Sequence, residues 1–417
     1  MKIIYFQQYF NTPEMSGSSR SYEFSKKLVE MGHEVEMITT YREPYKNNEW
    51  FETNYDGIKI HWLPLHYSNH MNFLERLKVF FTFVWKSYLR SRKIEGDIIF
   101  ASSTPLTIAI PAVLISKKKN IPMVFEVRDL WPDVPIAMKI LKNPVIIYFA
   151  KLLEIWAYNN AKSIIALSPE MKKGITLKKV DPKKIAVIPN SSDLEKFKFD
   201  KELAFDFRSK RPWLKNRPLL VYAGAFGRVN NLSYAVFLAK ALIKQNSEIR
   251  ILLIGEGSEK KKLIEDAKKN GVYEINLFFE NQLPKKDMPA CLSAANITAN
   301  FVIDIRENWA NSANKFFDGL AAGKPIFLNH GGWMQDLVLN NKCGLCMYGK
   351  KMELIAKELD LAITNEAWLK SSGMASINLA RKFFDRNIHA QQLEEVLILT
   401  QNKKSELIYK VTNDLYN

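Results

Sequence analysis

The sequence predicts an α/β protein built from two Rossmann-like, doubly wound domains. Its 417 residues exceed the size of one ordinary domain and suggest two. Hydrophobic residues make up 47% of the chain and charged residues 25%, which is typical of a folded soluble protein and excludes disorder, collagen and a disulfide scaffold. Short apolar runs also alternate with segments of helical periodicity. Such alternation implies parallel sheets joined by right-handed crossovers.

The first half of the chain contains one series of these alternating elements. The segment Arg20–Met31 has helical periodicity, because Tyr22, Phe24 and Leu28 can share one face. The predicted strands of this half are residues 2–5, 34–39, 97–101, 122–127, 163–166 and 184–188.

A second series begins after residues 200–217, a highly charged segment that we interpret as a linker. From Asn387 onward the chain is predicted to be helical, with Leu393, Val396 and Leu397 on one face. The predicted strands of this half are residues 219–222, 250–254, 276–279, 297–301 and 325–328.

We therefore expect an N-terminal domain at residues 1–200 and a C-terminal domain at residues 217–384. The helix at about 385–417 is expected to return to the first domain. In doubly wound sheets, ligands bind at the carboxyl ends of the strands. Two such domains facing each other would form one central cleft.

The charge and the cysteines limit the partners and the compartment. Lys and Arg number 60 and Asp and Glu 44, a net charge of +16, which suggests nucleic acid, an anionic membrane or phosphorylated substrates. The three cysteines are too few for a disulfide framework and indicate a reducing compartment. Two of them, Cys343 and Cys346, form a CxxC without the further ligands that a closed zinc site needs. No signal peptide or transmembrane segment is predicted, so we expect a cytoplasmic protein.

The strongest candidate for chemistry is the segment Asn314–Ile326, which predicts a short helix followed by a buried strand. Lys315 and Asp318 are three residues apart and share one helical face. A helix N-terminus with a lysine suits a diphosphate, and a nearby carboxylate can accept bonds from two ribose hydroxyls. The alternative is a surface ion pair. The position after an apolar strand favours a nucleotide-diphosphate site.

Several motifs in order resemble the retaining glycosyltransferases of family 4, which have the GT-B fold. Asp318–Pro325 resembles the family's acidic residue followed by Leu-Ala-Ala-Gly-Lys-Pro. The segment Val127–Pro132 (Val-Arg-Asp-Leu-Trp-Pro) is similar to a subset that builds bacterial surface polysaccharides. The remaining matches are Gln8–Arg20, Gly32–Val35, Ile188–Asp193 and Tyr222–Arg228.

The resemblance implies that the domain at residues 1–200 binds the acceptor and the domain at residues 217–384 binds the donor. It also implies a site position by position. Asp318 falls on the family's second acid, which contacts the ribose of the donor nucleotide. The first acid, which helps to hold the donor sugar, would stand at Ala310, so Glu307, Asn308 or Asn311 are its possible substitutes. A lysine that often follows the Arg228 position is missing here, and Lys315 is expected to supply its charge.

The expected site therefore combines three groups of residues. The catalytic residues are expected to be Arg228, Lys315 and Asp129. The donor-binding residues are expected to be Asp318, Gly17, Gly224, Gly227, Asn314 and Glu307. The acceptor-side residues are expected to be Ser16, Ser18, Glu126 and Arg128. Arginine can bond phosphate oxygens bidentately, and the glycines let the backbone approach a ligand. No Asp-x-Asp occurs in the chain, so neither a metal nor a resident cofactor is expected.

The first domain contains an acidic cluster with two open interpretations. Glu126 and Asp129 flank Arg128 at a strand end. They could belong to a buried ion network or to a site. We favour attack on the same face of the sugar as the leaving group, with Asp129 orienting the acceptor, over a double displacement through a carboxylate nucleophile.

Two segments could lie on an anionic membrane. Met71–Lys93 holds one acid, Glu75, against six bases among aromatic residues, and Pro144–Trp156 is a second apolar-aromatic helix with Lys151. An amphipathic helix of this kind can bind anionic lipid, although a core-packed helix with a solvated face is the commoner outcome. The six bases are Arg76, Lys78, Lys86, Arg90, Arg92 and Lys93.

The leading hypothesis is a glycosyltransferase at the inner face of the cytoplasmic membrane. It would move a sugar, an N-acetylated amino or deoxyamino hexose, from a UDP-sugar to a polyprenyl-linked glycan. A nucleotide-sugar epimerase or dinucleotide-dependent oxidoreductase would need GxGxxG after the first strand, where residues 7–20 hold only Gly17, and Gly255-Glu256-Gly257 is a lone GxG. A nucleic-acid-binding protein would need a stacking or groove-reading module, and none of the usual signatures occurs, so no nucleic-acid partner is expected.

Overall fold

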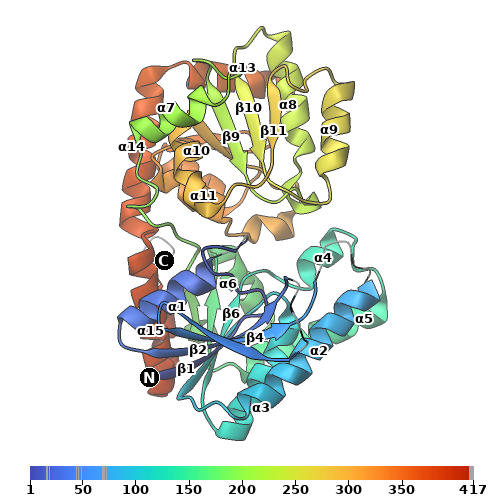
Figure 1. Ribbon diagram of the computed structural model, residues 1–417, viewed down its shortest axis with the longest axis vertical. Coiled ribbons are helices and arrows are strands. Elements are labelled where there is room, and N and C mark those ends of the chain that lie inside the picture. Colours follow the sequence, from blue (N-terminus) through green and yellow to red (C-terminus); the bar gives the residue numbers. More distant parts are fainter. Residues whose placement is uncertain are drawn as a thin grey trace. The chain divides into compact units, whose positions relative to one another are not determined.

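The computed structural model describes residues 1–15, 17, 19–43, 45, 47, 49–67, 71 and 73–412, without the side chains of residues 73 and 74. The chain forms two compact units, each with one sheet (Figure 1). The first unit comprises Met1–Pro189, Ala310–Ser312 and Asn387–Asn417, and the second comprises Asn190–Trp309 and Ala313–Arg386. The predicted fold class, two α/β domains with parallel sheets, is confirmed.

The sheet of the first unit has the strand order β3-β4-β2-β1-β5-β6-β7-β8. Every neighbouring pair is parallel except β3 and β4. The strand order reverses between β1 and β5, which makes this the switch point of the sheet. The strands are β1 (Lys2–Phe6), β2 (Glu34–Tyr41), β3 (Phe51–Tyr55), β4 (Ile58–Pro64), β5 (Ile98–Ser102), β6 (Met123–Val127), β7 (Ser163–Ala166) and β8 (Ile185–Val187).

The β3–β4 hairpin was not predicted, although the sequence holds its signal. Asp56 and Gly57 join the two strands, and both have positive φ, at 49° and 79°. An Asp-Gly pair with positive φ at both positions is typical of a two-residue hairpin turn. The antiparallel strand β3 is at the edge of the otherwise parallel sheet.

Right-handed crossovers assign the helices of the first unit to the two faces of its sheet. The crossover from β1 to β2 contains α1, and the crossovers that contain α2, α3 and α5 run in the opposite direction across the sheet, so these three helices lie on the other face. The helices are α1 (Arg20–Glu30), α2 (Phe73–Ser91), α3 (Ala109–Lys119), α4 (Asp133–Ala137), α5 (Pro144–Asn160), α6 (Pro169–Thr176) and α15 (Arg386–Gln401).

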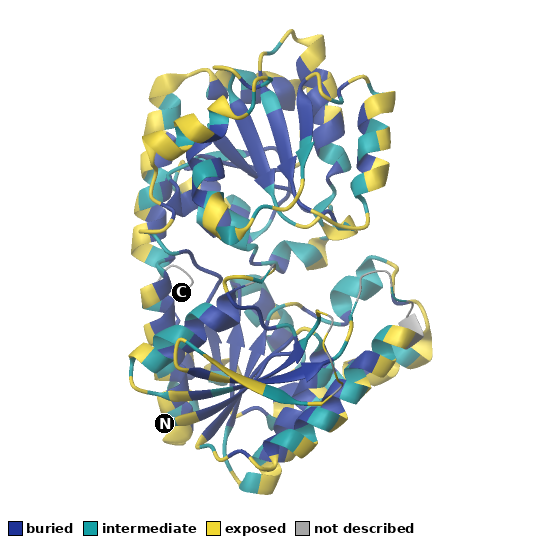
Figure 2. Ribbon diagram, in the orientation of Figure 1, coloured by how far each residue is buried: buried dark blue, intermediate teal, exposed yellow. Residues whose placement is uncertain are grey.

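The sheet of the second unit has the order β11-β10-β9-β12-β13-β14, with every neighbouring pair parallel and its switch point between β9 and β12. The strands are β9 (Leu219–Ala223), β10 (Arg250–Ile254), β11 (Leu277–Glu280), β12 (Ile297–Asn300), β13 (Ile326–Leu328) and β14 (Gly344–Cys346). The helices are α7 (Lys201–Ser209), α8 (Ser233–Lys244), α9 (Lys260–Lys269), α10 (Met288–Ala294), α11 (Asn314–Ala321), α12 (Trp333–Asn340), α13 (Met352–Ile363) and α14 (Glu366–Phe383). Most strand residues of both sheets are buried (Figure 2).

The boundary between the units differs from the expected one. The charged segment 200–217 is not a free linker, because it contains α7, whose Phe207 is buried against the second unit together with Leu214. Only Phe207 of this short helix is buried, so its charged and exposed residues dominate the composition. The second unit therefore begins at Asn190.

The C-terminal helix belongs to the first unit. Ala390, Leu393 and Val396 of α15 are part of its core, and His33 Nε2 lies 2.7 Å from Glu394 Oε1 beside the turn that follows α1. None of the helices in the described part of the chain is long and apolar enough to cross a membrane.

Candidate functional site

The switch point of the second sheet brings Lys315 to the end of β9. Lys315 lies in the first turn of α11, and its Nζ lies 4.8 Å from the centroid of the Tyr222 ring. The same Nζ lies 3.4 Å from Asn230 Oδ1. A Cβ added at Gly224 would lie 2.7 Å from Lys315 Cε, so the glycine leaves the room that this side chain occupies. Gly224 and Lys315, which were predicted separately as site residues, thus lie side by side.

The electrostatics at Lys315 favour an anionic ligand. Burial lowers the pKa of Lys315 to about 8, and no carboxylate of the described residues offsets this effect. The position near the N-terminus of α11 is also unfavourable for a cation, because the helix dipole is positive there. A bound diphosphate would offset both the ammonium charge of Lys315 and the positive end of the helix dipole.

Asp318 lies one turn further along α11 and accepts a hydrogen bond from Ser192 Oγ at 2.7 Å. Burial raises the pKa of Asp318, while the charges of Lys285 and Arg386 and the Ser192 bond act in the opposite direction. The partner Ser192 was not among the predicted site residues. Ser192 belongs to the segment Ile188–Asp193, which resembles a family motif. That resemblance was the signal by which Ser192 could have been predicted as a site residue.

The glycines of the lone GxG have a packing role. Gly255 and Gly257 have φ values of 154° and 155°, which favour glycine. A Cβ at Gly255 would lie 1.9 Å from the carbonyl oxygen of Gly224, and one at Gly257 would lie 2.5 Å from that of Phe226. These two residues therefore hold the loop after β9, and they are not part of a dinucleotide-binding fingerprint.

The loop after β9 also holds Gly227 and Arg228. Arg228 is exposed and begins the 3-10 helix η3 (Arg228–Asn230), which ends with the contact between Asn230 and Lys315. A Cβ at Gly227 would meet nothing closer than 3.9 Å, so close packing does not explain the glycine there. Arg228 is thus carried by the loop that reaches Lys315.

The residues expected to hold the donor sugar lie on α11 and on the 3-10 helix η5 (Arg306–Ala310). Asn314 is half-buried at the first position of α11. Glu307 is exposed on η5, whereas Asn308 Nδ2 donates to the carbonyl oxygen of Val229 at 3.4 Å. Ala310 is buried in the core of the first unit, where its carbonyl oxygen accepts a bond from Ser168 Oγ at 2.7 Å. Asn308 is therefore the possible substitute that contacts the β9 loop.

Polar side chains at the ends of β12 and β13 were missed by the sequence analysis. His330 is buried, its Nδ1 lies 2.8 Å from the carbonyl oxygen of Gly331, and its Nε2 lies 3.4 Å from Asn300 Nδ2. Burial lowers the pKa of His330 to about 4, to which the charge of Lys315 contributes. This imidazole is therefore neutral at pH 7. The sequence signal that could have identified His330 is its position directly before a Gly-Gly turn, just after a predicted strand.

In the first unit, Glu126 is held in a buried ion pair. Arg20 Nε and Nη2 donate to Glu126 Oε1 at 2.9 and 2.8 Å, and Ser102 Oγ donates to Oε2 at 2.5 Å. Burial alone would raise the pKa of Glu126, but the charges of Arg20 and Arg128 and the Ser102 bond outweigh it and lower the pKa. Both carboxylate oxygens of Glu126 already accept hydrogen bonds, so the structure favours the buried ion network over the expected acceptor-side contact.

Arg20 was not predicted as part of this region. Its Nη1 and Nη2 also donate to the carbonyl oxygens of Pro189 and Ile188, at 2.6 and 2.9 Å. Arg20 therefore joins the start of α1, the strand β6 and the segment after β8 at the carboxyl edge of the sheet. It is a positioning residue for that edge.

The other predicted residues of the first unit lie near this edge. Asp129 is exposed and accepts a bond from Thr104 Oγ1 at 3.2 Å, and the backbone N–H of Arg128 donates to Ser103 Oγ at 2.9 Å. Gly17 has a φ of 134°, which favours glycine. The remaining two, Ser16 and Ser18, lie outside the described residues.

Two α/β units with parallel sheets, and a lysine and a carboxylate one turn apart on α11, fit the class expected from the sequence, the GT-B glycosyltransferases. Comparison with known proteins agrees with this class. Residues 17–196 match the family model "Glycosyltransferase Family 4", and residues 205–378 match "Glycosyl transferases group 1". Together the two matches cover most of the chain, which therefore belongs to the glycosyltransferases of the GT-B fold.

The sequence identity to individual known proteins is low. The chain is 23% identical to the "Probable glycosyltransferase WbjE" of Pseudomonas aeruginosa over 255 residues, which are 60% of this chain and 61% of that protein. Among solved structures, sucrose-phosphate synthase of Thermosynechococcus elongatus has a TM-score of 0.76 at 15% identity, covering 95% of this chain and 98% of that one. Alr3699/HepE of Anabaena, in complex with UDP-glucose, has a TM-score of 0.70 at 15% identity, covering 95% and 99%. These two structures support the fold.

Proposed function

We propose that the protein transfers a sugar from a UDP-sugar to a polyprenyl-linked glycan, with retention of configuration, in bacterial surface polysaccharide synthesis. One observation carries the proposal: Lys315 and Asp318 lie one turn apart at the start of α11, at the switch point of the second sheet. Lys315 is a half-buried cation that contacts the loop after β9. A nucleoside diphosphate supplies both the anion and the ribose hydroxyls that these two side chains can bind.

The nature of the donor is supported by chemistry and by similarity. HepE, which has the same fold, was solved with UDP-glucose. In this chain we assign the diphosphate to Lys315 and Arg228 and the ribose to Asp318. The choice of an N-acetylated amino or deoxyamino hexose rests on the resemblance of Val127–Pro132 to polysaccharide-building relatives.

The proposed mechanism separates departure of the diphosphate from activation of the acceptor. As the bond to the sugar breaks, negative charge grows on the diphosphate, and positioned cations stabilise it without a general base. Lys315 and Arg228 are the cations of this step. Asp129 is the acceptor-orienting carboxylate, because it is exposed and Glu126 is already paired with Arg20. The acceptor hydroxyl attacks the sugar on the face of the departing diphosphate and passes its proton to a diphosphate oxygen, which gives retention.

We place the reaction in the cytoplasm, at the inner face of the cytoplasmic membrane, where a polyprenyl-linked acceptor would be available. The three cysteines are free thiols, which suits a reducing compartment. The mechanism needs no resident cofactor, since the nucleotide sugar is a substrate.

A panel of nucleotide sugars tests the proposal. The protein is mixed with UDP-, GDP-, dTDP- and ADP-linked sugars, and binding and slow hydrolysis are measured. We expect binding of a UDP-sugar and no binding of the others at equal concentration. With a polyprenyl-diphosphate-linked acceptor, the NMR coupling constant of the product should show the donor's anomeric configuration. Absence of binding to every nucleotide sugar, or an inverted product, would contradict the proposal.

The role of Arg228 has a separate test. Arg228→Ala should lower kcat by about 10²-fold or more and change donor binding much less, because the charge on the diphosphate is greatest in the transition state. Arg306→Ala, at an exposed arginine on η5, is the matched control and should leave both values unchanged. Equal losses of turnover and binding in Arg228→Ala would exclude a role specific to the leaving group.

A further inference from the structure

We infer that the first unit docks on an anionic lipid bilayer through the outward face of α5, extended by an exposed stripe on α2. This inference does not rest on the proposed reaction. Of the two membrane candidates expected from the sequence, Met71–Lys93 and Pro144–Trp156, it assigns the main contact to the second and a smaller part to the first.

The outward face of α5 is its more apolar face. Val145, Tyr148 and Phe149 are 61%, 60% and 63% exposed, and Leu152 and Ile155 continue the face. The residues of α5 that are buried are Ala150, Glu154, Ala157 and Tyr158. A helix on the surface of a water-soluble protein normally buries its apolar face and exposes its polar face. The exposed aromatic and aliphatic side chains therefore need a partner that is itself apolar.

The charges around this face are positive. Lys151 is exposed on α5, and Lys139 and Lys142 are exposed just before it. The acid of α5, Glu154, is buried, lies 3.5 Å from Lys178 Nζ and accepts a bond from Tyr158. No carboxylate of α5 thus opposes an anionic surface.

An exposed stripe on α2 repeats this pattern. Phe81, Trp85 and Leu89 are four residues apart, so they lie along one line of the helix, and they are 55%, 62% and 39% exposed. Lys78 is exposed near the start of the stripe, and Arg92 is exposed just beyond its end.

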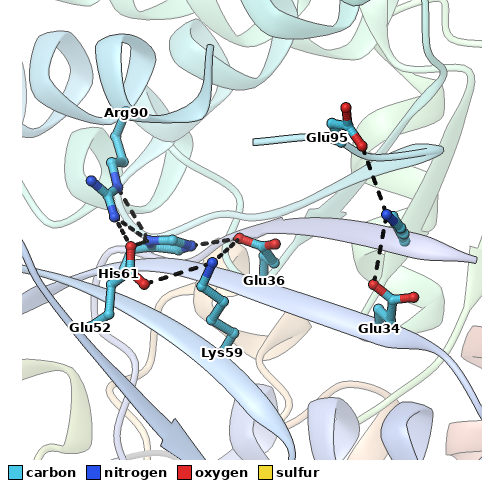
Figure 3. Close-up of polar contacts among 8 residues, drawn as sticks. Glu34, Glu36, Glu52, Lys59, His61, Arg90 and Glu95 are labelled. Atoms are coloured by element: carbon cyan, nitrogen blue, oxygen red, sulfur yellow. Dashed lines mark hydrogen bonds and ion pairs between the residues drawn. The ribbon is translucent and has the colours of Figure 1, made fainter. Parts of the chain in front are cut away.

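Arg90 does not belong to this surface. Its guanidinium contacts Glu52 and donates from Nε to His61 Nδ1 at 3.2 Å (Figure 3). His61 is itself buried, with Nε2 2.7 Å from Glu36 Oε2. Arg90 therefore anchors the end of α2 to β3 and β4, and it is a poor choice for testing membrane binding.

The two helices present their faces on the same side of the sheet. The crossovers through α2, α3 and α5 run in one direction and lie on the face opposite to α1. α3 contacts both α2 and α5, and its Leu114 is 41% exposed. The three helices thus form one layer whose outer surface is rich in exposed apolar side chains.

The chemistry of this surface favours a bilayer over a protein partner. Interfaces between proteins are depleted in lysine, whereas Lys139, Lys142 and Lys151 surround the aromatic residues here. Tyrosine and tryptophan with lysine are typical of helices that lie at a membrane surface, with the apolar side chains inserted and the ammonium groups near the phosphates. Each base near an anionic surface increases binding by about fivefold.

Vesicle flotation tests the inference with the full-length protein. We expect binding to vesicles of phosphatidylcholine and phosphatidylglycerol in equal parts and much weaker binding to phosphatidylcholine alone. Salt should weaken binding but not abolish it, because the apolar side chains also contribute. Absence of binding to the anionic vesicles would overturn the inference.

Two double variants separate apolar insertion from charge. Tyr148→Ser with Phe149→Ser should weaken vesicle binding by about tenfold or more. Lys142→Gln with Lys151→Gln should weaken it mainly at low salt. The matched control is Phe205→Ser with Phe237→Ser, at two phenylalanines that are 76% and 53% exposed on the second unit, and it should bind like the wild type. Equal binding by the Tyr148/Phe149 variant and this control would overturn the inference.

A label on α5 reports insertion directly. The three native cysteines are buried, so the thiol of a Phe149→Cys variant can be labelled selectively with an environment-sensitive dye. Its emission should shift to the blue when anionic vesicles are added, while the same dye on Phe205→Cys should not respond. A shift without vesicles that grows with protein concentration would instead identify contact between two copies of the chain, and the inference would be wrong. Turnover on a soluble acceptor is measured separately and without lipid. A failure of the proposed reaction can then be told apart from a failure of membrane docking.

Discussion

Lys315 and Asp318 show how two side chains three residues apart can acquire different tasks. Lys315 extends to Tyr222 and Asn230 at the end of β9, whereas Asp318 bonds Ser192. Their spacing places both on one face of α11, and the glycine at position 224 makes room for the lysine. Each side chain can therefore be tested by itself.

Asp318→Asn should lower the affinity for a UDP-sugar by about 10- to 100-fold while the protein stays folded, because a hydrogen bond to a charged group contributes about 1.5–3 kcal/mol. Isothermal titration calorimetry measures the affinity, and thermal unfolding checks the fold. Asp304→Asn, at an exposed aspartate of the loop after β12, is the control and should bind like the wild type. A folded Asp318→Asn protein with unchanged affinity would refute the ribose assignment.

The affinity for the donor should depend on pH through Lys315. Its pKa is lowered to about 8 in the free protein, and a bound diphosphate would raise it by stabilising the ammonium group. Binding above pH 8 then takes up a proton, so the affinity should be constant below pH 8 and fall above it by about tenfold per pH unit. Titration calorimetry between pH 6 and about 9.5 measures this. Burial also lowers the pKa of Lys324 to about 8, so a variant of Lys315 is needed to assign the effect.

Lys315→Arg provides the control for this pH dependence. An arginine stays charged throughout the range, so the affinity of this variant should be independent of pH, whatever its absolute value. A parallel decline in both proteins would assign the effect to another group.

At the scale of elements, the loops after the strands are fixed by contacts between segments far apart in the chain. Gly255 and Gly257 after β10 support the loop after β9, and Arg20 at the start of α1 bonds β6 and the segment after β8. Both arrangements occur at the carboxyl edge of a parallel sheet, where several strand ends meet. The conformation of the loops at this edge therefore depends on contacts between pairs of elements and not on single sequence motifs.

Glu126→Gln should strongly destabilise the first unit. The change leaves the buried guanidinium of Arg20 without its counter-ion, and breaking such a pair costs about 3–5 kcal/mol. Urea unfolding measures the free energy of unfolding. Asp206→Asn breaks the exposed pair with Lys210 and should cost about 1 kcal/mol at most. A Glu126→Gln protein as stable as this control would mean that the pair does not hold the edge together.

At the scale of the whole molecule, the positive charge is spread over both units, and the sequence contains no Asp-x-Asp. The proposed chemistry uses Lys315 and Arg228 to stabilise the diphosphate, so a divalent cation has no required task in it. Turnover should therefore continue in excess EDTA at an unchanged rate. Activity that disappears with EDTA and returns with Mg²⁺ or Mn²⁺ would contradict this mechanism.

The sequence by itself determined the alternation of strands and helices, because local periodicity follows directly from which side chains face a core. It also located Lys315 and Asp318 on one helical face, since their spacing is local. Only the tertiary structure decided that Glu126 pairs with Arg20, 106 residues away, that Gly255 packs on Gly224, and that α5 turns Tyr148 and Phe149 outward. The physical reason is that a partner or an exposed face depends on which segments the fold brings together, and this arrangement leaves no periodic pattern in either segment alone.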